Sequence, residues 1–317
     1  MTDRPDCTII VMTYNQQDFV AEAIRSVLAQ EGPPLDILIS DDCSTDRSFA
    51  VAEATVAGYS GPHRVEMNRN PVNLGITAHL NRCIALAQGE ILIVAAGDDI
   101  SLPQRARRIR DTFAETDALL VHSRVEVFPP ITPARRLPHD RALFLRSTDL
   151  AAAATSIALY IGATGAWHRD LFRKYGPLPD RDVYEDLILG FRAALEGRVA
   201  FIDEALVRYR FEAGVSQADS GPLTPGAWRG ARLRALRRNR AVMAQRLVDA
   251  HTYGMQDSDP VVRRLRRELA LQQTRADVHE QPVLTFLRRH AASPAVALHA
   301  LVSECRRTRR ALRAASG

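Results

Sequence analysis

A tight turn that carries two carboxylates, Gly97-Asp98-Asp99, follows the apolar run Glu90–Ala95. A hard divalent cation that bridges phosphate groups needs one or two carboxylates and keeps several waters. An aspartate pair on a turn directly after a strand can supply those ligands, so the turn is a candidate site for Mn²⁺ or Mg²⁺. The alternative is a turn with a helix cap, which explains an isolated Asp-Asp pair at least as well.

Short apolar runs alternate with amphipathic segments through the first half, a pattern typical of strands and crossover helices in a mostly parallel sheet. Strands are predicted at Cys7–Met12, Leu35–Ile39, Arg64–Met67 and Glu90–Ala95. Helices are predicted at Asp18–Gln30 and from Asp46 through Ala57. A third helix is predicted after Asn73-Leu74-Gly75, ending at about Gln88, and a fourth begins at Ser101–Pro103. Ligands bind such sheets at the carboxyl ends of the strands. We therefore expect the polar residues that follow the strands to meet at one edge.

The amino-acid composition of the rest of the chain changes at two places. Residues 123–147 are rich in Pro and Arg and predict a loop over the sheet. Beyond it we expect a helix at Glu185–Glu196 and two short strands at Val199–Ile202 and Ala205–Phe211. A Gly/Pro/Ser-rich stretch then precedes a helical, arginine-rich pattern, which indicates a boundary near residue 221. The predicted organisation is a domain of residues 1–220 and a helical region of residues 221–317.

The order of motifs resembles the family 2 glycosyltransferases, whose GT-A fold is a Rossmann-like α/β domain with a mostly parallel sheet flanked by helices. The resemblance covers about residues 7–216 and begins with Thr13-Tyr14-Asn15 and the segment from Ser40 to Asp46. It implies that residues 1–122 bind a nucleotide sugar and residues 123–220 the acceptor, with Tyr14 stacked near the base and Asp41 hydrogen-bonded to it. The implied donor-binding residues are Thr13, Tyr14, Asn15, Asp41, Asp42, Asn73, Gly75, Asn81 and Gly97.

The metal motif departs from the family's Asp-x-Asp pattern, because its first aspartate aligns with Ala96. The resemblance then leaves Asp98 as the metal ligand and Asp99 as its support. Many members carry a later histidine near the metal, whereas this chain has Glu212, which is either a third oxygen ligand or a solvated loop acid.

The acidic pair Glu185-Asp186 occupies the family's position for the catalytic base. A carboxylate with a raised pKa, shielded from water, suits removal of a proton from a hydroxyl. We expect Asp186 to be this base, with Glu185 as the rival; alternatively both acids stabilise a helix N-terminus by roughly 0.3 to 1 kcal/mol each. Trp167 and His168 are assigned to the acceptor side, although core packing or a structural role is commoner for such residues.

The resemblance implies transfer of a hexosyl group from a UDP-, dTDP- or GDP-sugar to a carbohydrate or lipid-linked acceptor, in the synthesis of surface polysaccharides or glycoconjugates. It also implies a metal-assisted reaction with inversion. The chain lacks the processive family's arginine motif after Glu185-Asp186, so we expect a single transfer. The alternative is an inactive protein of the same fold that binds an anionic surface or a partner.

The composition excludes several other classes. The chain has 317 residues, 46% of them hydrophobic, and a net charge of +5 carried almost entirely by arginine. It shows no secretory leader or long apolar run, so we expect a cytoplasmic enzyme. An aromatic content of 6% argues against a nucleic-acid partner. The helical segment Trp228–Arg240 suits the inner face of the cell membrane, a homodimer contact or a solvated face.

Overall fold

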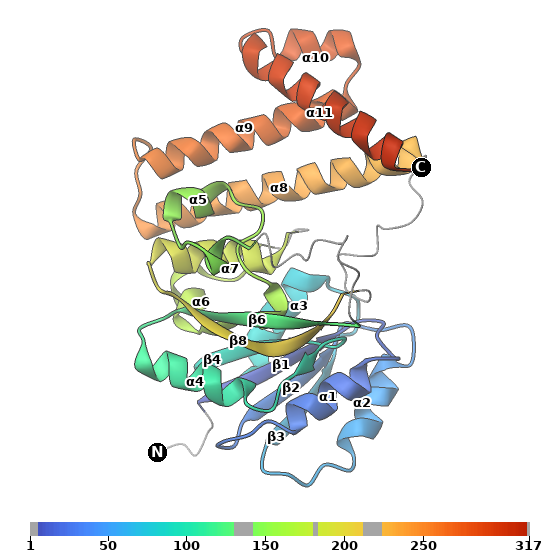
Figure 1. Ribbon diagram of the computed structural model, residues 1–317, viewed down its shortest axis with the longest axis vertical. Helices are drawn as coiled ribbons and strands as arrows, with labels where there is room; N and C mark the ends of the chain where they lie inside the picture. Colours follow the sequence, from blue (N-terminus) through green and yellow to red (C-terminus); the bar gives the residue numbers. More distant parts are fainter. Residues whose placement is uncertain (1–5, 130–141, 180–182, 212–223, 316–317) are drawn as a thin grey trace. The chain divides into compact units, whose positions relative to one another are not determined.

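The computed structural model describes residues 6–129, 142–179, 183–211 and 224–315. The chain divides into two compact units, residues 1–214 and 215–317. The predicted boundary near residue 221 lies outside the described residues. Figure 1 shows that the first unit is built from a sheet with helices and the second from helices.

A sheet of eight strands forms the centre of the first unit, in the order β3-β2-β1-β4-β7-β6-β8-β5. The strands are β1 (Cys7–Thr13), β2 (Asp36–Asp41), β3 (Arg64–Arg69), β4 (Ile91–Ala96), β5 (Ile100–Ser101), β6 (Leu120–Phe128), β7 (Ala166–His168) and β8 (Val199–Arg210). The first four strands of the chain are parallel, and β7 is antiparallel to both of its neighbours. The predicted α/β fold with a mostly parallel sheet is confirmed.

Helices cover this sheet because its central strands are apolar on both faces. In β1 and β4 nearly every residue is buried. The helix α1 buries Val20, Ala23, Ile24 and Val27 on one side, at the spacing of an amphipathic helix. The helices of this unit are α1 (Val20–Leu28), α2 (Ser48–Val56), α3 (Ile76–Leu86), α4 (Arg105–Glu115), α5 (Leu150–Thr155), α6 (Asp170–Tyr175) and α7 (Glu185–Leu195).

The prediction of a loop over residues 123–147 is wrong in its first part, because β6 continues to Phe128. Its outer half pairs in parallel with β8, through Val125 opposite Val207 and Val127 opposite Tyr209. The charged residues Arg124 and Glu126 alternate with these valines, because the outer half of the strand lies partly open to water. This half therefore lacks the continuous apolar run by which the buried strands were predicted. Residues 130–141 lie outside the described part of the chain.

Two further predicted elements differ from the structure. β8 is one strand rather than two: the Asp203-Glu204 pair that suggested a break lies at an irregular point in the pairing with β6. The helix expected from Ser101 begins later, at Arg105, because Ser101 forms the short strand β5 and pairs with Val207.

The second unit contains α8 (Pro225–Tyr253), α9 (Pro260–Glu280), α10 (Val283–Arg289) and α11 (Pro294–Ala315). Its interior includes Glu304, whose fully buried carboxylate accepts hydrogen bonds from Arg232 at 2.7 and 2.8 Å and lies 3.0 Å from Nε2 of His279. These partners lower the pKa of Glu304 to about 2. Among the described helices, none has the length and apolarity to cross a membrane.

The basic face of α8 is largely used inside this unit. Arg232 pairs with Glu304 on α11, Arg237 pairs with Glu280 on α9, and Leu236 is completely buried. The side chain of Arg229 donates to the carbonyl of His279. The segment Trp228–Arg240 therefore makes contacts inside its own helical unit through Leu236 and these arginines, and its contact with a membrane or a second copy stays a prediction.

Candidate active site

The carboxyl ends of β2, β1 and β4 meet at one edge of the sheet through backbone hydrogen bonds. The amide of Asp42 donates to the carbonyl of Thr13 at 3.0 Å, and the amide of Gly97 donates to the carbonyl of Met12 at 2.9 Å. Thr13 and Asp41 are register partners in the β1–β2 pair. The polar residues that follow these strands are thus close in space, as parallel pairing requires.

The loops after β1 and β2 are joined through Asn15, a non-glycine residue with a left-handed backbone (φ 52°). Its amide donates to Oγ of Ser44 at 2.9 Å, and its side-chain Oδ1 accepts from the amide of Thr45 at 2.9 Å. Asparagine tolerates this conformation better than most residues. Tyr14 is left 44% exposed beside this junction, and Asn15 itself fixes the path of the second loop.

Asp41 offers a buried acceptor at this edge. One of its carboxylate oxygens, Oδ2, accepts from the amide of Ser44 at 2.9 Å and lies 3.6 Å from Nε of Arg69. The other oxygen, Oδ1, is buried and has no hydrogen-bond donor among the residues that the structure describes. Buried carboxylate oxygens are normally satisfied, so this atom indicates a position for an external donor group.

Asp42 holds a neighbouring loop. Its Oδ1 accepts from Nδ2 of Asn70 at 2.8 Å and from the amide of Leu74 at 2.9 Å, and its Oδ2 accepts from the amide of Gly75 at 2.9 Å. Asn73 also accepts from the Gly75 amide, at 2.9 Å, and Gly75 has the positive φ of 77° that favours glycine. Asp42 thus positions the 70–75 loop, which exposes Leu74 beside the site.

The side chain of Asn81 bonds to the backbone of a distant loop. Its Nδ2 donates to the carbonyl of Leu178 at 2.9 Å, and its Oδ1 accepts from the amide of Leu178 at the same distance. The side-chain amide is therefore used to attach the loop before α7 to α3. Both ends of its amide are occupied by backbone, so a direct hydrogen bond from Asn81 to a donor is not indicated, and its place in the donor pocket stays a prediction.

Gly97 permits the closest approach between the β1 and β4 loops. A Cβ at this position would lie 2.4 Å from Oε1 of Gln16 and 2.9 Å from Cβ of Thr13. The side chain of Gln16 also hydrogen-bonds Asp98. Sequence reasoning missed Gln16, because a single glutamine after Asn15 carries no spacing signal. Any larger residue at position 97 would push the loops apart.

Asp98 and Asp99 are both buried, with about 5% and 6% of each residue exposed. Burial raises the pKa of Asp98, and burial together with the adjacent Asp98 carboxylate raises the pKa of Asp99 to about 8. A cation bound beside the pair would relieve the cost of holding two negative charges out of water. The donor set of hard oxygens therefore fits Mn²⁺ or Mg²⁺.

Arg210, at the end of β8, brings a positive charge to the aspartate turn. Its amide donates to Oδ1 of Asp99 at 2.7 Å, and its Nε donates to the carbonyl of Asp98 at 3.0 Å. The guanidinium packs over the rings of Phe19 and Phe128. Glu212, predicted as a third oxygen ligand or a solvated loop acid, lies outside the described residues.

The acidic pair Glu185-Asp186 begins α7 and faces the 3₁₀ turn η3 (Gly162–Thr164). Oε1 of Glu185 lies 2.6 Å from the place where a Cβ on Gly162 would be, so the glycine makes room for this carboxylate. Burial raises the pKa of Glu185. The turn η3 packs against β4, and Nη2 of Arg105 joins the two by donating to the carbonyls of Val94 and Ala163.

Trp167 and His168 do not have the positions expected of them. The indole of Trp167 is completely buried and donates to the hydroxyl of Tyr160 at 3.0 Å, so it has no face to offer a sugar. His168 pairs with Ile91, the first residue of β4, whereas Gly97 follows the last. Six residues of parallel strand, roughly 17 to 20 Å, separate these ends. The assignment of both residues to the acceptor side is therefore wrong.

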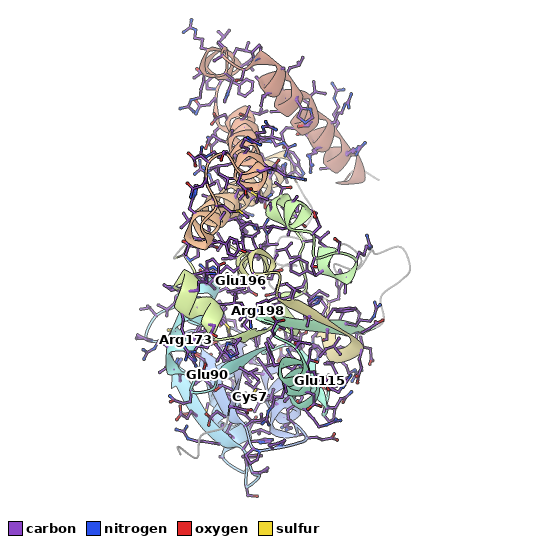
Figure 2. All side chains as sticks on the ribbon, turned by 90° about the vertical axis from the view of Figure 1, so that its left-hand side faces the viewer. Cys7, Glu90, Glu115, Arg173, Glu196 and Arg198 are labelled. Carbon is purple, nitrogen blue, oxygen red and sulfur yellow. The ribbon has the colours of Figure 1, made fainter. Side chains whose placement is uncertain are left out.

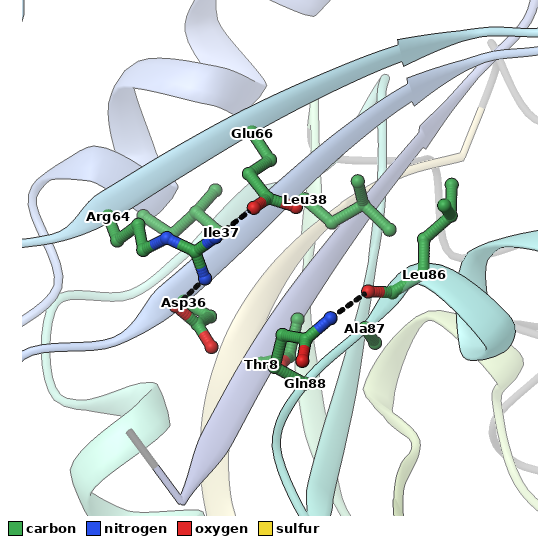
Figure 3. Close-up of a pocket in the computed structure, with 9 residues that line it drawn as sticks. All are labelled: Thr8, Asp36, Ile37, Leu38, Arg64, Glu66, Leu86, Ala87 and Gln88. Carbon is green, nitrogen blue, oxygen red and sulfur yellow. Dashed lines mark hydrogen bonds and ion pairs between the residues drawn. The ribbon is translucent and has the colours of Figure 1, made fainter. Parts of the chain in front are cut away.

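Two features at the opposite edge of the sheet do not form the active site. Glu90, His168 and Asp170 could hold a cation by spacing, but Arg173 already pairs with both carboxylates at 2.7 and 2.8 Å; Figure 2 labels Glu90 and Arg173. Figure 3 shows a hollow beside Thr8 and Asp36, at the amino ends of β1 and β2. Its volume of about 10 Å³ leaves room for roughly one water.

The fold and this carboxyl edge define the GT-A class of α/β transferases. The model of glycosyl transferase family 2 matches residues 8–176, and the chain belongs to this family. This is the family that the order of motifs in the sequence resembled.

Known relatives match part of this chain. The succinoglycan biosynthesis protein ExoO of Rhizobium meliloti is 37% identical over 105 residues, which is 33% of this chain and 29% of ExoO. The match to EpsE of Bacillus subtilis spans 38% of that protein, so the chain matches well under two thirds of these relatives.

Two solved structures share the fold at low sequence identity. S. aureus TarS 1–349 in complex with UDP-GlcNAc has a TM-score of 0.58 at 16% identity, with 98% of this chain and 92% of that chain covered. The mannosyltransferase PcManGT from Pyrobaculum calidifontis, in complex with GDP-Man and Mn²⁺, has a TM-score of 0.58 at 17% identity, with 99% and 84% covered.

Proposed function

We propose that this glycosyltransferase moves a sugar from a nucleoside diphosphate sugar to an acceptor hydroxyl, with the donor base at the ends of β1 and β2. The observation that carries the proposal is the buried Oδ1 of Asp41, which lacks a donor among the described residues. The ring N–H of uracil, thymine or guanine is a donor that satisfies such an atom. Tyr14, exposed next to the register partner of Asp41, supplies a ring for the base to stack on.

We propose Asp98 as the ligand of Mn²⁺ or Mg²⁺ and Asp99 as its support. When bound, such a metal neutralises the charge that develops on the leaving diphosphate. Burial and the raised pKa of both carboxylates support this role. Arg210 holds the turn from its backbone side, and its guanidinium pairs with Glu22 at 2.8 Å.

We propose Asp186 as the base that removes the proton of the acceptor hydroxyl, with Glu185 as the rival. Both residues start α7 beside η3, which packs on β4. Burial raises the pKa of Glu185 at this place, and an environment that raises the pKa of a carboxylate supports the role of a base. The supporting geometry applies to both acids, so substitution of each must separate them.

The acceptor proposed for the enzyme is a carbohydrate or lipid-linked hydroxyl in the synthesis of a surface polysaccharide or glycoconjugate. The support is the name of ExoO, which refers to succinoglycan biosynthesis. We further propose a single transfer with inversion, catalysed on the cytoplasmic side with peripheral contact to the membrane through the C-terminal helices. Each of these points stays a prediction until the acceptor is known.

Calorimetric titration with UDP, GDP and dTDP, each with and without Mn²⁺, tests the proposal. We expect one nucleotide to bind and its affinity to rise with metal in the parent but not in Asp98→Ala. Asp41→Asn should weaken the same nucleotide by about tenfold or more, because it replaces an ionised acceptor. Asp117→Asn, a change of an aspartate elsewhere on the surface, is the matched control and should bind like the parent.

A second candidate function follows from Ala96, which stands where the family's first metal aspartate is expected. An inactive protein of this fold would bind a partner or an anionic surface instead of a donor. Failure of all three nucleotides to bind to folded protein would favour this candidate over the enzyme.

A further inference from the structure

We infer that the exposed side of α10 and α11 docks this protein on the surface of an anionic phospholipid bilayer. The docking face consists of two sets of side chains, the apolar residues Val283, Leu284, Leu287, Leu298 and Val302 and the arginines Arg288, Arg306, Arg309 and Arg310. The inference rests on the proposed function in one respect: a lipid-linked acceptor lies at such a surface, which gives the docking a biological purpose. Its physical support comes from the helical unit alone.

The apolar half of the docking face is unusually open to water. In α10, Val283, Leu284 and Leu287 are 65%, 72% and 51% exposed, while Phe286 is buried. Leu284 and Leu287 are three residues apart and therefore neighbours on the helix surface. Single exposed apolar residues are ordinary, but a cluster of large ones on one short helix indicates an interaction site.

The helix α11 carries a second exposed strip, which changes from apolar to basic along the helix. It buries Ala297, Ala300 and Glu304 on one side. At 100° per residue, Leu298, Val302 and Arg309 lie on the opposite side. One exposed strip of α11 thus begins with apolar residues that are 62% and 38% exposed and ends in arginines.

The charge of this region is large and only partly compensated, since Arg289 pairs with Asp277 on α9 at 3.3 Å. Residues 283–310 contain six arginines and a single acid, Glu304, so their formal charge of +5 equals that of the whole chain. Glu304 is buried and already paired. Arg306 and Arg310 line an open groove of about 580 Å³ with Arg232 and Arg307. In the described part of the chain, neither Arg306 nor Arg310 has an acidic partner, and like charges four residues apart repel.

Apolar residues next to arginines match an anionic bilayer better than the other occupants. Nucleic acid would pair with the arginines but gives no reason for exposed leucines. A second copy in a two-fold dimer would place this surface against itself, and its arginines would repel. The headgroups of anionic lipids attract the arginines, while the leucines enter the boundary between headgroups and acyl chains. Both halves of the docking face are then satisfied.

Sedimentation of the full chain with vesicles tests the inference. We expect binding to vesicles of mixed phosphatidylglycerol and phosphatidylcholine and little binding to phosphatidylcholine alone. The triple variant Arg306→Gln/Arg309→Gln/Arg310→Gln should lose about a hundredfold in vesicle affinity, since each arginine contributes about 1 kcal/mol near such a surface. The double variant Leu284→Glu/Leu287→Glu should lose binding even at low salt.

Matched controls come from the same helical unit. Val248→Glu changes an exposed apolar residue on α8, and Arg263→Gln/Arg267→Gln changes exposed arginines on α9; both should bind vesicles like the parent. The inference is overturned if the parent ignores anionic vesicles, or if the docking-face variants bind as well as these controls. It is also overturned if the leucine variant instead dissociates a dimer in light scattering. Titration of each variant with the nucleotide tests the proposed function separately.

Discussion

Asp99 is the residue whose ionisation should leave the clearest mark on stability. Its pKa of about 8 lies far above the ordinary value of 3.8, because burial and the Asp98 carboxylate disfavour its charge. Between these two pKa values the folded protein keeps a proton on Asp99 that the unfolded chain has lost. The contribution of Asp99 to stability is therefore fully present below pH 4 and is lost as pH rises through 8. The folded state should weaken from this group across that window.

We accordingly expect Asp99→Asn to flatten the dependence of stability on pH. Asparagine carries no charge to bury, and its Oδ1 can still accept from the Arg210 amide. Thermal unfolding without divalent metal, from pH 4 to 9, should show the variant more stable than the parent at the alkaline end. Asp203→Asn removes an exposed carboxylate and should follow the parent. Parallel profiles for Asp99→Asn and the parent would contradict the expectation.

Asp186 and Glu185 are to be separated by paired substitutions. If Asp186 is the base, Asp186→Asn should keep nucleotide affinity and lower turnover by about 10² to 10⁴, the usual contribution of a general base. Glu185→Gln should then cost less. Release of the nucleoside diphosphate in the presence of acceptor measures turnover, and calorimetry measures binding. A larger loss for Glu185→Gln would transfer the role to that residue.

At the scale of elements, the active-site edge depends on how closely the loops after β1 and β4 approach. Gly97→Ala should destabilise the protein by about 1 to 3 kcal/mol, because the added methyl lies 2.9 Å from Cβ of Thr13. We also expect weaker nucleotide binding, since the displaced Thr13 precedes Tyr14. Urea unfolding and calorimetry measure the two effects. Gly58→Ala meets no atom within 4 Å and serves as the control, so equal behaviour of the two variants would contradict this account.

At the scale of the whole molecule, two compact units with separate interiors should respond separately to mutation. Glu304 is a buried charge of the helical unit, and Glu304→Gln leaves Arg232 and His279 without their anion. Removal of one member of a buried ion pair costs about 3 to 5 kcal/mol. We therefore expect the helical unit to unfold at lower urea concentration while the first unit keeps its nucleotide affinity.

The two tryptophans allow this experiment, because Trp167 lies in the first unit and Trp228 in the second. In a Trp167→Phe background, fluorescence reports the helical unit alone. Glu280→Gln removes the partner of Arg237, which is 63% exposed, and should cost about 1 kcal/mol or less. Equal costs for the two glutamate variants would mean that burial of Glu304 has no energetic consequence. The pKa of Glu304 is lowered from 4.5 to about 2, so the stability that its charge contributes is present above pH 4.5 and is lost as pH falls through 2.

The sequence by itself determined the α/β fold, the family and the edge of the sheet at which Asp41 and Gly97 both lie. Parallel strands bring the residues after their carboxyl ends together whatever the loops do, so order along the chain was enough. The start of α9 is equally local, because the side chain of Asp259 accepts from the amide of Val261 and Pro260 stands in the first turn.

Only the tertiary structure decided how individual side chains are used. Asn81 meets Leu178, 97 residues away, and Asp42 meets the Gly75 amide, 33 residues away, so no local pattern could assign these hydrogen bonds. His168 follows Trp167 in sequence, yet the antiparallel direction of β7 carries it to the opposite edge of the sheet. Direction of pairing, and competition among distant partners for each polar atom, are properties of the folded chain.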